Sequence, residues 1–339
     1  MSPFIGWLND FKKIPETVEE ISDNATTNCE IDTLEISKNV RKIGNGPLGT
    51  YHIKLDKNNP YFSVAHDCLF NKDGSSIYAY ENNIANSDSL QMILGSVKCI
   101  KNGAVVLMGS VQMKNLDALD SICPNAFWYA EDLLDSASIS IPSNLRYIGP
   151  MSLCNFNKIN IDNSNKYFSY KDETLYNKDG TKLIYSKYTR DYSLVIPETV
   201  DTISAYAIFG LPVTNIEIPS SVNYIGENAM CYLPKLKNIK CDGPIPPSVG
   251  KYGLYYYYNS ATLTVPKGSI ELYRRAPYWS LFKHIVEEES DGIKNPISNH
   301  ANITEIARYD IQGRSIHVPE KGINIIKMSD GSVRKVLVK

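Results

Sequence analysis

The chain has 339 residues, of which 43% are hydrophobic, and it carries a formal net charge of −2 at pH 7. A chain of this length and apolar content can bury a sizeable core, and a near-neutral balance with no basic stripe excludes a nucleic-acid partner. No stretch reaches the roughly 18 apolar residues of a membrane-spanning helix, so we expect no transmembrane segment.

The N-terminal residues 1–13 differ in pattern from the rest of the chain. Phe4, Trp7, Leu8 and Phe11 recur at helical spacing, which predicts a short amphipathic cap over the first coil of a repeat array. The segment has no basic n-region, no long apolar core and no cleavage site, so it is not a signal peptide. We expect either an intracellular protein or a chain that lacks its natural start.

A short phrase returns throughout residues 14–288. It reads Ile-Pro-Glu-Thr-Val at both 14–18 and 196–200, and each copy continues with an Ile three residues after the Val and an Ala four residues later. The step from Val18 to the equivalent Val40 is 22 residues (40 − 18). Steps of roughly 20–29 residues are typical of leucine-rich repeats.

The two apolar patches of each repeat predict two short strands. In Ile216-Glu217-Ile218 the side chains alternate between two faces, as a strand requires. The proline that comes next cannot donate to a ladder, so it closes the strand. One repeat cannot bury its own apolar face, whereas stacked repeats bury a continuous column. We therefore predict a mainly β solenoid with short helical turns.

Two longer gaps between repeats contain the same insertion. It reads Leu-Phe-Asn-Lys-Asp-Gly at 69–74 and Leu-Tyr-Asn-Lys-Asp-Gly at 175–180, an offset of 106 residues (175 − 69). The Asn-Lys-Asp-Gly turn between apolar runs indicates a β-hairpin in which Gly takes a positive φ. We expect hairpins near residues 55–80 and 161–186 that project from the edge of the solenoid.

The C-terminal part of the chain closes the array and then departs from it. The strand phrase resumes at 263–269, after which Trp279 and Phe282 are expected to plug the last coil. Residues 289–301 are a polar, turn-rich linker. Residues 302–339 contain short alternating strands separated by glycine turns, which predict a small β domain.

One repeat, from Ile216 to Ala229, carries the full pattern Ile-x-Ile-Pro-Ser-Ser-Val-x-x-Ile-Gly-x-x-Ala. This pattern closely resembles the BspA-like leucine-rich repeats of bacterial surface proteins. The resemblance runs from Ile14 to Glu287 and includes the insertions and the terminal motif, although Ile208 and Met230 stand where Phe is usual. It implies a non-enzymatic, adhesin-like protein that recognises host or partner macromolecules, such as extracellular-matrix proteins, through its solenoid surface. The alternative is a structural spacer or presentation module without a tight ligand.

The last segment, from Tyr309 to Lys339, resembles the C-terminal sorting domains of type IX secretion in the Bacteroidetes. It contains Tyr-Asp-Ile-Gln-Gly-Arg at 309–314 and ends in Lys-Val-Leu-Val-Lys. The resemblance implies a protein that is secreted or held at the cell surface. A cytoplasmic location is the alternative.

Residues able to perform chemistry are scattered along the chain. The local cluster His66-Asp67-Cys68 cannot form a catalytic triad, because consecutive strand residues point to opposite faces. No P-loop, dinucleotide fingerprint, G-x-S-x-G or calcium loop is present. We expect no enzyme activity, no cofactor and no metal. The seven cysteines show no CxxC spacing, which favours buried free thiols over the alternatives of disulfides or a metal site.

Stacked strands place their outward side chains in columns, with one residue from each coil. The residue before the second conserved Ile gives one column, namely Glu20, Lys42, Cys99, Ser121, Tyr147, Thr202 and Tyr224. The residue between the first pair of Ile gives a second column, namely Glu35, Ser140, Val195 and Glu217.

Tyrosine is the candidate contact residue, because the chain has 23 of them against three tryptophans and an amphipathic ring binds at low entropic cost. The predicted ligand-binding residues lie in the C-terminal half and are Tyr147, Tyr206, Tyr224, Tyr255, Tyr256 and Tyr257. We expect a monomer that binds a protein or glycan with them. The alternative is that these rings merely cover the last coils.

Overall fold

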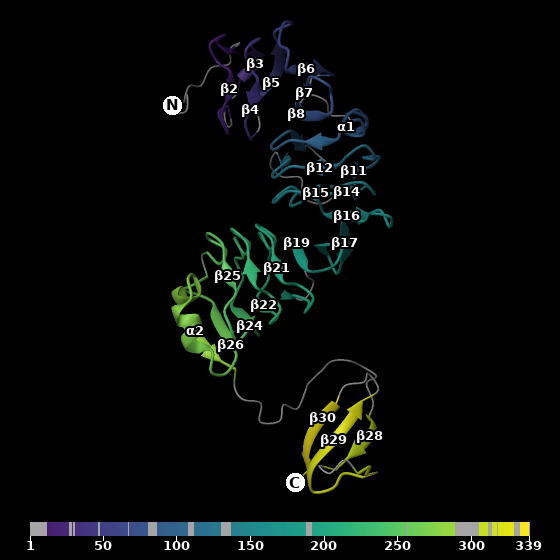
Figure 1. Cartoon of the computed structure of the whole chain (residues 1–339), viewed down its shortest axis with the longest axis vertical. Helices are drawn as coiled ribbons and strands as arrows, with labels where there is room; N and C mark the ends of the chain where they lie inside the picture. Colours follow the sequence, from purple (N-terminus) through teal and green to yellow (C-terminus); the bar gives the residue numbers. More distant parts are fainter. Residues whose placement is uncertain are drawn as a thin grey trace. The chain divides into compact units, whose positions relative to one another are not determined.

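The computed structural model describes residues 12–26, 29, 31–46, 48–66, 68–80, 87–107, 112–129, 137–187, 192–255, 257–288, 305–310, 314–316, 318–328 and 333–338. The expected cap lies outside these residues except for Lys12 and Lys13, and the expected linker lies outside them entirely. The chain divides into two compact units, Met1–Glu287 and Glu288–Lys339 (Figure 1).

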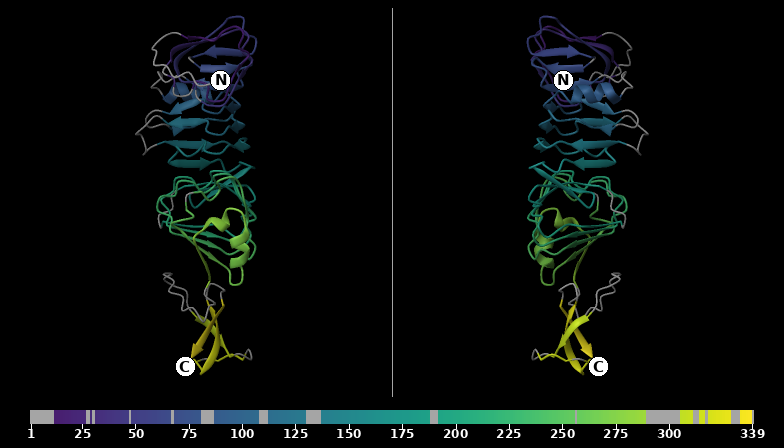
Figure 2. Two further views of the ribbon diagram at one scale, coloured as in Figure 1. Left: turned by 90° about the vertical axis from the view of Figure 1, so that its left-hand side faces the viewer. Right: turned by 90° about the vertical axis from the view of Figure 1, so that its right-hand side faces the viewer.

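The first unit is a mainly β solenoid, which confirms the predicted fold; its coils stack one on another in Figure 2. The Ile-x-Ile half of each repeat supplies one series of parallel strands. The series comprises β1 (Lys12–Lys13), β3 (Ile31–Ile36), β5 (Thr50–Leu55), β11 (Gln112–Met113), β14 (Ser138–Ile141), β16 (Lys158–Ile161), β20 (Ser193–Val195), β22 (Asn215–Ile218), β24 (Asn238–Cys241), β26 (Thr262–Val265) and β27 (His284–Glu287). Its sheets have the orders β1-β3-β5, β11-β14-β16 and β20-β22-β24-β26-β27.

The Val-x-x-Ile half of each repeat supplies a second parallel series. It comprises β2 (Glu20–Ile21), β4 (Lys42–Ile43), β8 (Ser76–Tyr80), β9 (Cys99–Ile100), β12 (Ser121–Ile122), β15 (Tyr147–Ile148), β19 (Lys182–Ser186), β21 (Thr202–Ile203), β23 (Tyr224–Ile225) and β25 (Ser248–Val249). Ile203 pairs with Ile225, and Ile225 pairs with Val249. Side chains at this position therefore form a buried column, in which Ile203 and Ile225 are both 0% exposed.

The two insertions differ from the expected projecting hairpins. Each is a three-stranded antiparallel meander, made of β6 (Phe62–Ala65), β7 (Cys68–Asn71) and β8 in the first copy and of β17 (Phe168–Lys171), β18 (Thr174–Asn177) and β19 in the second. The turn glycines Gly74 and Gly180 do have positive φ, at 75° and 71°. However, β8 pairs in parallel with β9, and β19 with β21. The third strand of each meander thus belongs to a solenoid sheet, because the backbone N–H and C=O groups on its free edge pair with the strand of the next coil.

Each insertion is tied to the coil before it by one buried asparagine. Asn59 donates from Nδ2 to the carbonyls of Ser37 and Val40 at 2.9 and 3.0 Å, while its Oδ1 accepts from the Phe62 N–H at 2.9 Å. Asn165, 106 residues later, makes the same set of bonds to Pro142, Leu145 and Phe168. A buried polar group that satisfies several backbone groups in this way fixes the corner.

A few short elements complete the first unit. They are α1 (Ser87–Leu94), α2 (Ile270–Arg275), the 3₁₀ turn η1 (Trp279–Leu281) and the parallel pair β10 (Val105–Leu107) and β13 (Phe127–Tyr129). Trp279 and Phe282 are 0% and 5% exposed, so they plug the last coil as predicted. Trp279 Nε1 donates to the Pro247 carbonyl at 2.8 Å, which gives its buried N–H a partner.

The second unit is a three-stranded antiparallel sheet of order β28-β29-β30. Its strands are β28 (Glu305–Tyr309), β29 (Gly322–Met328) and β30 (Val333–Val338). Beside β28, the Asp310 carboxylate accepts from the Arg314 backbone N–H at 2.9 Å and from Arg314 Nε at 2.6 Å. These bonds hold Asp310 and Arg314 together.

Substituting Ile225 by Ala tests the stacked core. Because Ile225 is fully buried between Ile203 and Val249, the change should lower the free energy of unfolding by about 2–5 kcal/mol, as for other large-to-small core substitutions. Chemical denaturation of the purified chain measures this loss. Glu227→Ala, an exposed position two residues away, is the matched control and should change stability by no more than about 0.5 kcal/mol. A loss below about 1 kcal/mol for Ile225→Ala would contradict the coil register.

Candidate functional site

The predicted outward columns are confirmed by the strand register. In the first column Glu20 pairs with Lys42, Cys99 with Ser121, and Thr202 with Tyr224. In the second, Val195 pairs with Glu217. A 22-residue step read from the sequence therefore places surface side chains on neighbouring rungs.

Of the five predicted tyrosines that the structure describes, three are exposed. Tyr147, Tyr224 and Tyr255 are 48%, 43% and 40% exposed, and Tyr206 is half-buried. Tyr147 ends the six-stranded sheet that begins at β6, whereas Tyr224 lies in the sheet that begins at β17, after the second insertion. Tyr147 is thus set in a different sheet from the tyrosines of the last coils.

The prediction that Tyr257 is a contact residue is wrong, because its side chain is buried. Its side chain is 5% exposed, and its hydroxyl accepts a hydrogen bond from the backbone N–H of Leu233. The ring belongs to the core of the last coils, since its one polar atom is used to satisfy a buried amide. Tyr256 lies outside the described residues.

One corner of the coil has an unusual backbone. This corner lies three residues after the conserved Ile of the second strand, or after Val249 in the coil that has Val there. In most coils the residue at this position has a positive φ. These residues are Asn24, Gly46, Gly103, Asn125, Met151, Tyr206, Asn228 and Tyr252. We call this the left-handed corner. Gly and Asn adopt such a φ at low cost, whereas bulky side chains there cost roughly 1–2 kcal/mol.

Tyr206 and Tyr252 occupy the left-handed corner at φ 55° and 58°. Asn228 separates them by one coil, and its Nδ2 donates to the Tyr206 hydroxyl at 2.9 Å. The backbone N–H of Asn228 in turn donates to the Lys251 carbonyl at 3.0 Å, next to Tyr252. The sequence thus places two aromatic rings on a backbone that favours small residues.

Further rings lie at this corner in two groups, one around Phe209 and one formed by Tyr252 and Tyr255. Phe209 lies 6.2 Å from Tyr206 and 5.4 Å from Tyr232 between ring centroids, and Tyr252 lies 5.1 Å from Tyr255. Tyr232 is 61% exposed and also has a positive φ, at 53°. We call Tyr206, Phe209, Tyr232, Tyr252 and Tyr255 the aromatic corner surface.

Phe209, Tyr232 and Tyr252 were not among the predicted site residues. A signal for Tyr252 was available, because the step of three residues from Ile203 to Tyr206 also leads from Val249 to Tyr252. Phe209 and Tyr232 gave no such signal. Ile208 and Met230 fill the buried positions where Phe was expected and are 0% exposed, which leaves Phe209 on the half-exposed side of its turn.

Two charged groups lie beside rings of the aromatic corner surface. Lys251 Nζ lies 5.0 Å from the centroid of the Tyr252 ring, a cation–π distance. Burial raises the pKa of Tyr206, and the nearby Glu227 carboxylate adds to the rise. The Tyr206 hydroxyl therefore stays protonated at neutral pH and can donate a hydrogen bond to a ligand.

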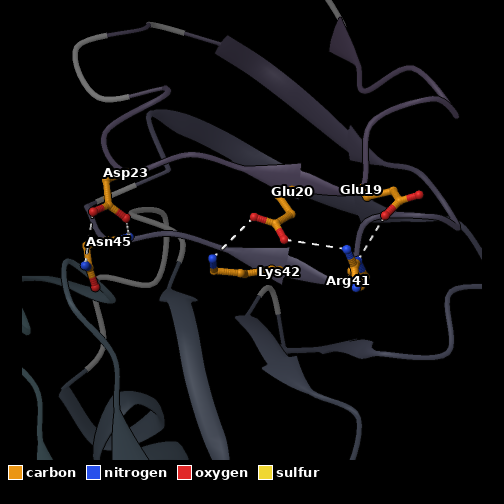
Figure 3. A network of polar contacts seen from close by, with 6 residues as sticks. All are labelled: Glu19, Glu20, Asp23, Arg41, Lys42 and Asn45. Carbon is orange, nitrogen blue, oxygen red and sulfur yellow. Dashed lines mark hydrogen bonds and ion pairs between the residues drawn. The ribbon is translucent and has the colours of Figure 1, made fainter.

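The N-terminal coils carry polar and charged side chains that bind one another between neighbouring coils, as Figure 3 shows. Glu19 lies 3.1 Å from Arg41, Glu20 lies 3.3 Å from Lys42, and Asp23 accepts from the Asn45 backbone N–H at 2.7 Å. Each acidic residue meets the residue 22 positions later. Because these pairs are exposed, each is worth at most about 1 kcal/mol. Two of the three acidic side chains therefore pair with a basic side chain of the next coil, whereas Asp23 is bound by the neutral Asn45.

The geometry offers no support for catalysis at His66–Cys68. His66 is exposed, whereas Cys68 is 0% exposed, and Asp67 lies outside the described residues. Within the described part of the chain, no group of three or more His, Cys, Asp or Glu side chains could hold a metal ion. No helix among the described residues is long and apolar enough to cross a membrane.

The chain belongs to the BspA type leucine-rich repeat family. Six copies of the BspA type leucine rich repeat region match it, over residues 8–57, 78–180 and 184–285, which confirms the resemblance read from the repeat phrase. Repeats of this family are typically non-enzymatic, and leucine-rich repeat proteins commonly bind protein ligands. A search of curated proteins finds no match.

The solved structures that are similar to this chain include the following three. A leucine rich cell surface protein from Faecalibacterium prausnitzii is 16% identical with a TM-score of 0.40, covering 86% of this chain and 90% of that one. A leucine-rich repeat protein from Eubacterium ventriosum is 17% identical with a TM-score of 0.38, covering 76% and 65%. The pneumococcal vaccine antigen PcpA is 13% identical with a TM-score of 0.27, covering 83% and 89%.

Tyr252→Asn tests whether the ring is held at the left-handed corner against backbone preference. Asn takes this φ more easily than Tyr, so the free energy of unfolding should stay the same or rise by up to about 1 kcal/mol despite the lost contact with Tyr255. Thermal and chemical unfolding measure the change. Tyr255→Asn, at an exposed position without a positive φ, is the control and should give no gain. A clear loss of stability in Tyr252→Asn would mean that the ring is needed for packing.

Proposed function

We propose that this protein is a non-enzymatic, adhesin-like binding protein that recognises a protein or glycan through the aromatic corner surface. The observation that carries the proposal is the retention of exposed or half-buried rings on strained backbone. Tyr206, Tyr232 and Tyr252 all have positive φ values between 53° and 58°. Backbone strain of this kind gathers at functional sites, where the placement of the side chain outweighs its cost.

The chemistry of the surface supports a macromolecular ligand. Tyrosine rings present apolar area together with a hydroxyl, and they lose little conformational freedom on binding. Both protein contact surfaces and sugar faces match this combination. The rings are held by a stack of rigid coils, so a ligand would meet a preformed surface and lose little free energy in ordering it.

The N-terminal coils support a spacer role for their own part of the chain. The Glu19–Arg41 and Glu20–Lys42 pairs neutralise one another between coils, which leaves few free charges for a partner. A structural spacer without a tight ligand is therefore the second candidate for the whole protein, and a blank binding screen would favour it.

A screen of the purified chain against matrix proteins, mucins and glycans tests the binding proposal. Substituting Tyr232 and Tyr255 together by Ala should weaken a saturable interaction by at least about tenfold, because exposed aromatic anchors carry much of an interface's energy. The matched control is the double variant in which Tyr61 and Tyr167 are replaced by Ala. These two residues are 46% and 45% exposed at the corners of the two insertions, and the control should bind as the unchanged protein does. Equal losses in both double variants would place the ligand elsewhere.

We also propose that the protein acts outside the cell and that the C-terminal unit directs its export. The resemblance of residues 309–339 to sorting domains supports this, and so does the separate compactness of the unit. A small β unit that folds apart from the solenoid suits a sorting signal, because it can be recognised without disturbing the binding surface.

Removing residues 303–339 tests this second proposal with two measurements. The thermal unfolding midpoint of the solenoid should not change, because the two units are compact separately. In the cell that naturally makes the protein, labelling by a membrane-impermeant reagent should be lost. Retained surface labelling would contradict the sorting role, and a large fall in the unfolding midpoint would mean that the unit is part of the solenoid fold.

A further inference from the structure

Two cysteines on neighbouring rungs of the solenoid are in contact. The Sγ atoms of Cys99 and Cys123 lie 3.8 Å apart. Cys99 belongs to β9, and Cys123 directly follows β12, the next strand of the same parallel sheet. Both side chains are half-buried, so a small reagent can reach them.

The backbone holds the two thiols in this arrangement. Ile100 pairs with Ile122, and the Cys123 N–H donates to the Ile100 carbonyl at 2.9 Å. Gly149 of the following coil packs against the other side, where an added Cβ would come within 2.7 Å of the Cys123 carbonyl carbon. Cys123 is therefore fixed from both directions, and joining the sulfurs requires side-chain movement from 3.8 Å to the length of a disulfide, about 2.05 Å.

The surroundings favour an anion on one of the two sulfurs. The hydrogen bond from Cys123 lowers the pKa of Cys99, and the Ser121 hydroxyl and the positive charge of Lys101 act in the same direction. The same sharing of one proton raises the pKa of Cys123. Cys99 is thus suited to be the attacking thiolate, because the thiolate is the nucleophilic form of cysteine.

Four of the other five cysteines lack this environment. Cys68, Cys231 and Cys241 are buried, and burial raises the pKa of Cys154, Cys231 and Cys241. Buried, protonated thiols react slowly. These residues serve as internal references for the reactivity of the pair.

We propose that Cys99 and Cys123 form a thiol–disulfide exchange site that takes small-molecule disulfides and closes to a disulfide between adjacent coils. The Cys99 thiolate attacks one sulfur of the small disulfide, forms a mixed disulfide and releases the first thiolate, which takes the Cys123 proton. The Cys123 thiolate then attacks the Cys99 sulfur and releases the second thiolate. The second thiolate takes from solvent the proton that Cys99 lost when its thiolate formed. Overall the two cysteines give up two protons and two electrons, and the small disulfide becomes two thiols.

The closed bond would link two rungs that are already paired. It joins residues 24 positions apart (123 − 99), and a crosslink of this kind stabilises by limiting the unfolded chain. In an oxidising location the pair would persist as a disulfide, and in a reducing one as two thiols. This inference does not depend on the proposed ligand or on the aromatic corner surface.

Oxidised glutathione added to the fully reduced chain provides the test. Peptide mass spectrometry should find Cys99 linked to Cys123, with the loss of two hydrogen atoms from the intact mass. In Cys123→Ser, the glutathione adduct at Cys99 should persist because the resolving thiol is absent. In Cys99→Ser, adduct formation at Cys123 should be at least about tenfold slower than adduct formation at Cys99 in the first variant.

Cys154→Ser is the matched control, since Cys154 is also half-buried but donates to the Met151 carbonyl at 3.0 Å. It should leave the Cys99–Cys123 link unchanged. Cys99→Ala and Cys123→Ala, checked by thermal unfolding, replace any serine variant that does not fold. The inference is overturned if glutathione adds first to another cysteine, if no link forms while adducts accumulate at both positions, or if the link forms equally fast in a denatured chain.

Discussion

Each coil of the solenoid approaches the previous one to backbone contact distance, and the rest of the molecule depends on this spacing. A Cβ added at Gly44, Gly149 or Gly226 would lie within 2.5 Å of the backbone of the preceding coil, closer than real Cβ atoms come. Where the coils meet this tightly, the Ile of one strand must pack on the Ile of the next. The apolar column and the parallel hydrogen bonds therefore fix each other's register, and neither would form in a single coil.

The same spacing sets what the surface can display. Each coil contributes one outward residue to every column, so residues of neighbouring coils can pair along a column, as the charged residues of the N-terminal coils do. In the same way, the left-handed corners of successive coils form a row of equivalent positions. Asn or Gly holds most of the positions in that row. Met151, Tyr206 and Tyr252 depart from this preference, and the two tyrosines, with Tyr232, bring rings onto positive-φ backbone. The aromatic corner surface is thus a local exception built on a regular frame.

The repeat spacing allowed the two strand series and their columns to be predicted, because a 22-residue period states which side chains share a face; Thr202 and Tyr224 pair as expected. Local sequence could not decide which of four consecutive tyrosines points inward. Tyr257 does so because its hydroxyl satisfies the Leu233 amide, a partner 24 residues away. The contact of Cys99 with Cys123 could not be predicted from the repeat spacing either. In the paired strands Cys99 lies opposite Ser121, and Cys123 lies two residues further along.

The paired corner asparagines bear on how such a chain changes in evolution. Asn59 and Asn165 make matching bonds to the coil behind them, and the strands β8 and β19 that end the two blocks present matching edges to the coil ahead. A block with the same connector at both ends can be copied or lost by recombination within the gene without redesigning any neighbour. The solenoid can then lengthen or shorten in whole blocks, and the tyrosine-bearing end moves with it while keeping its own geometry intact.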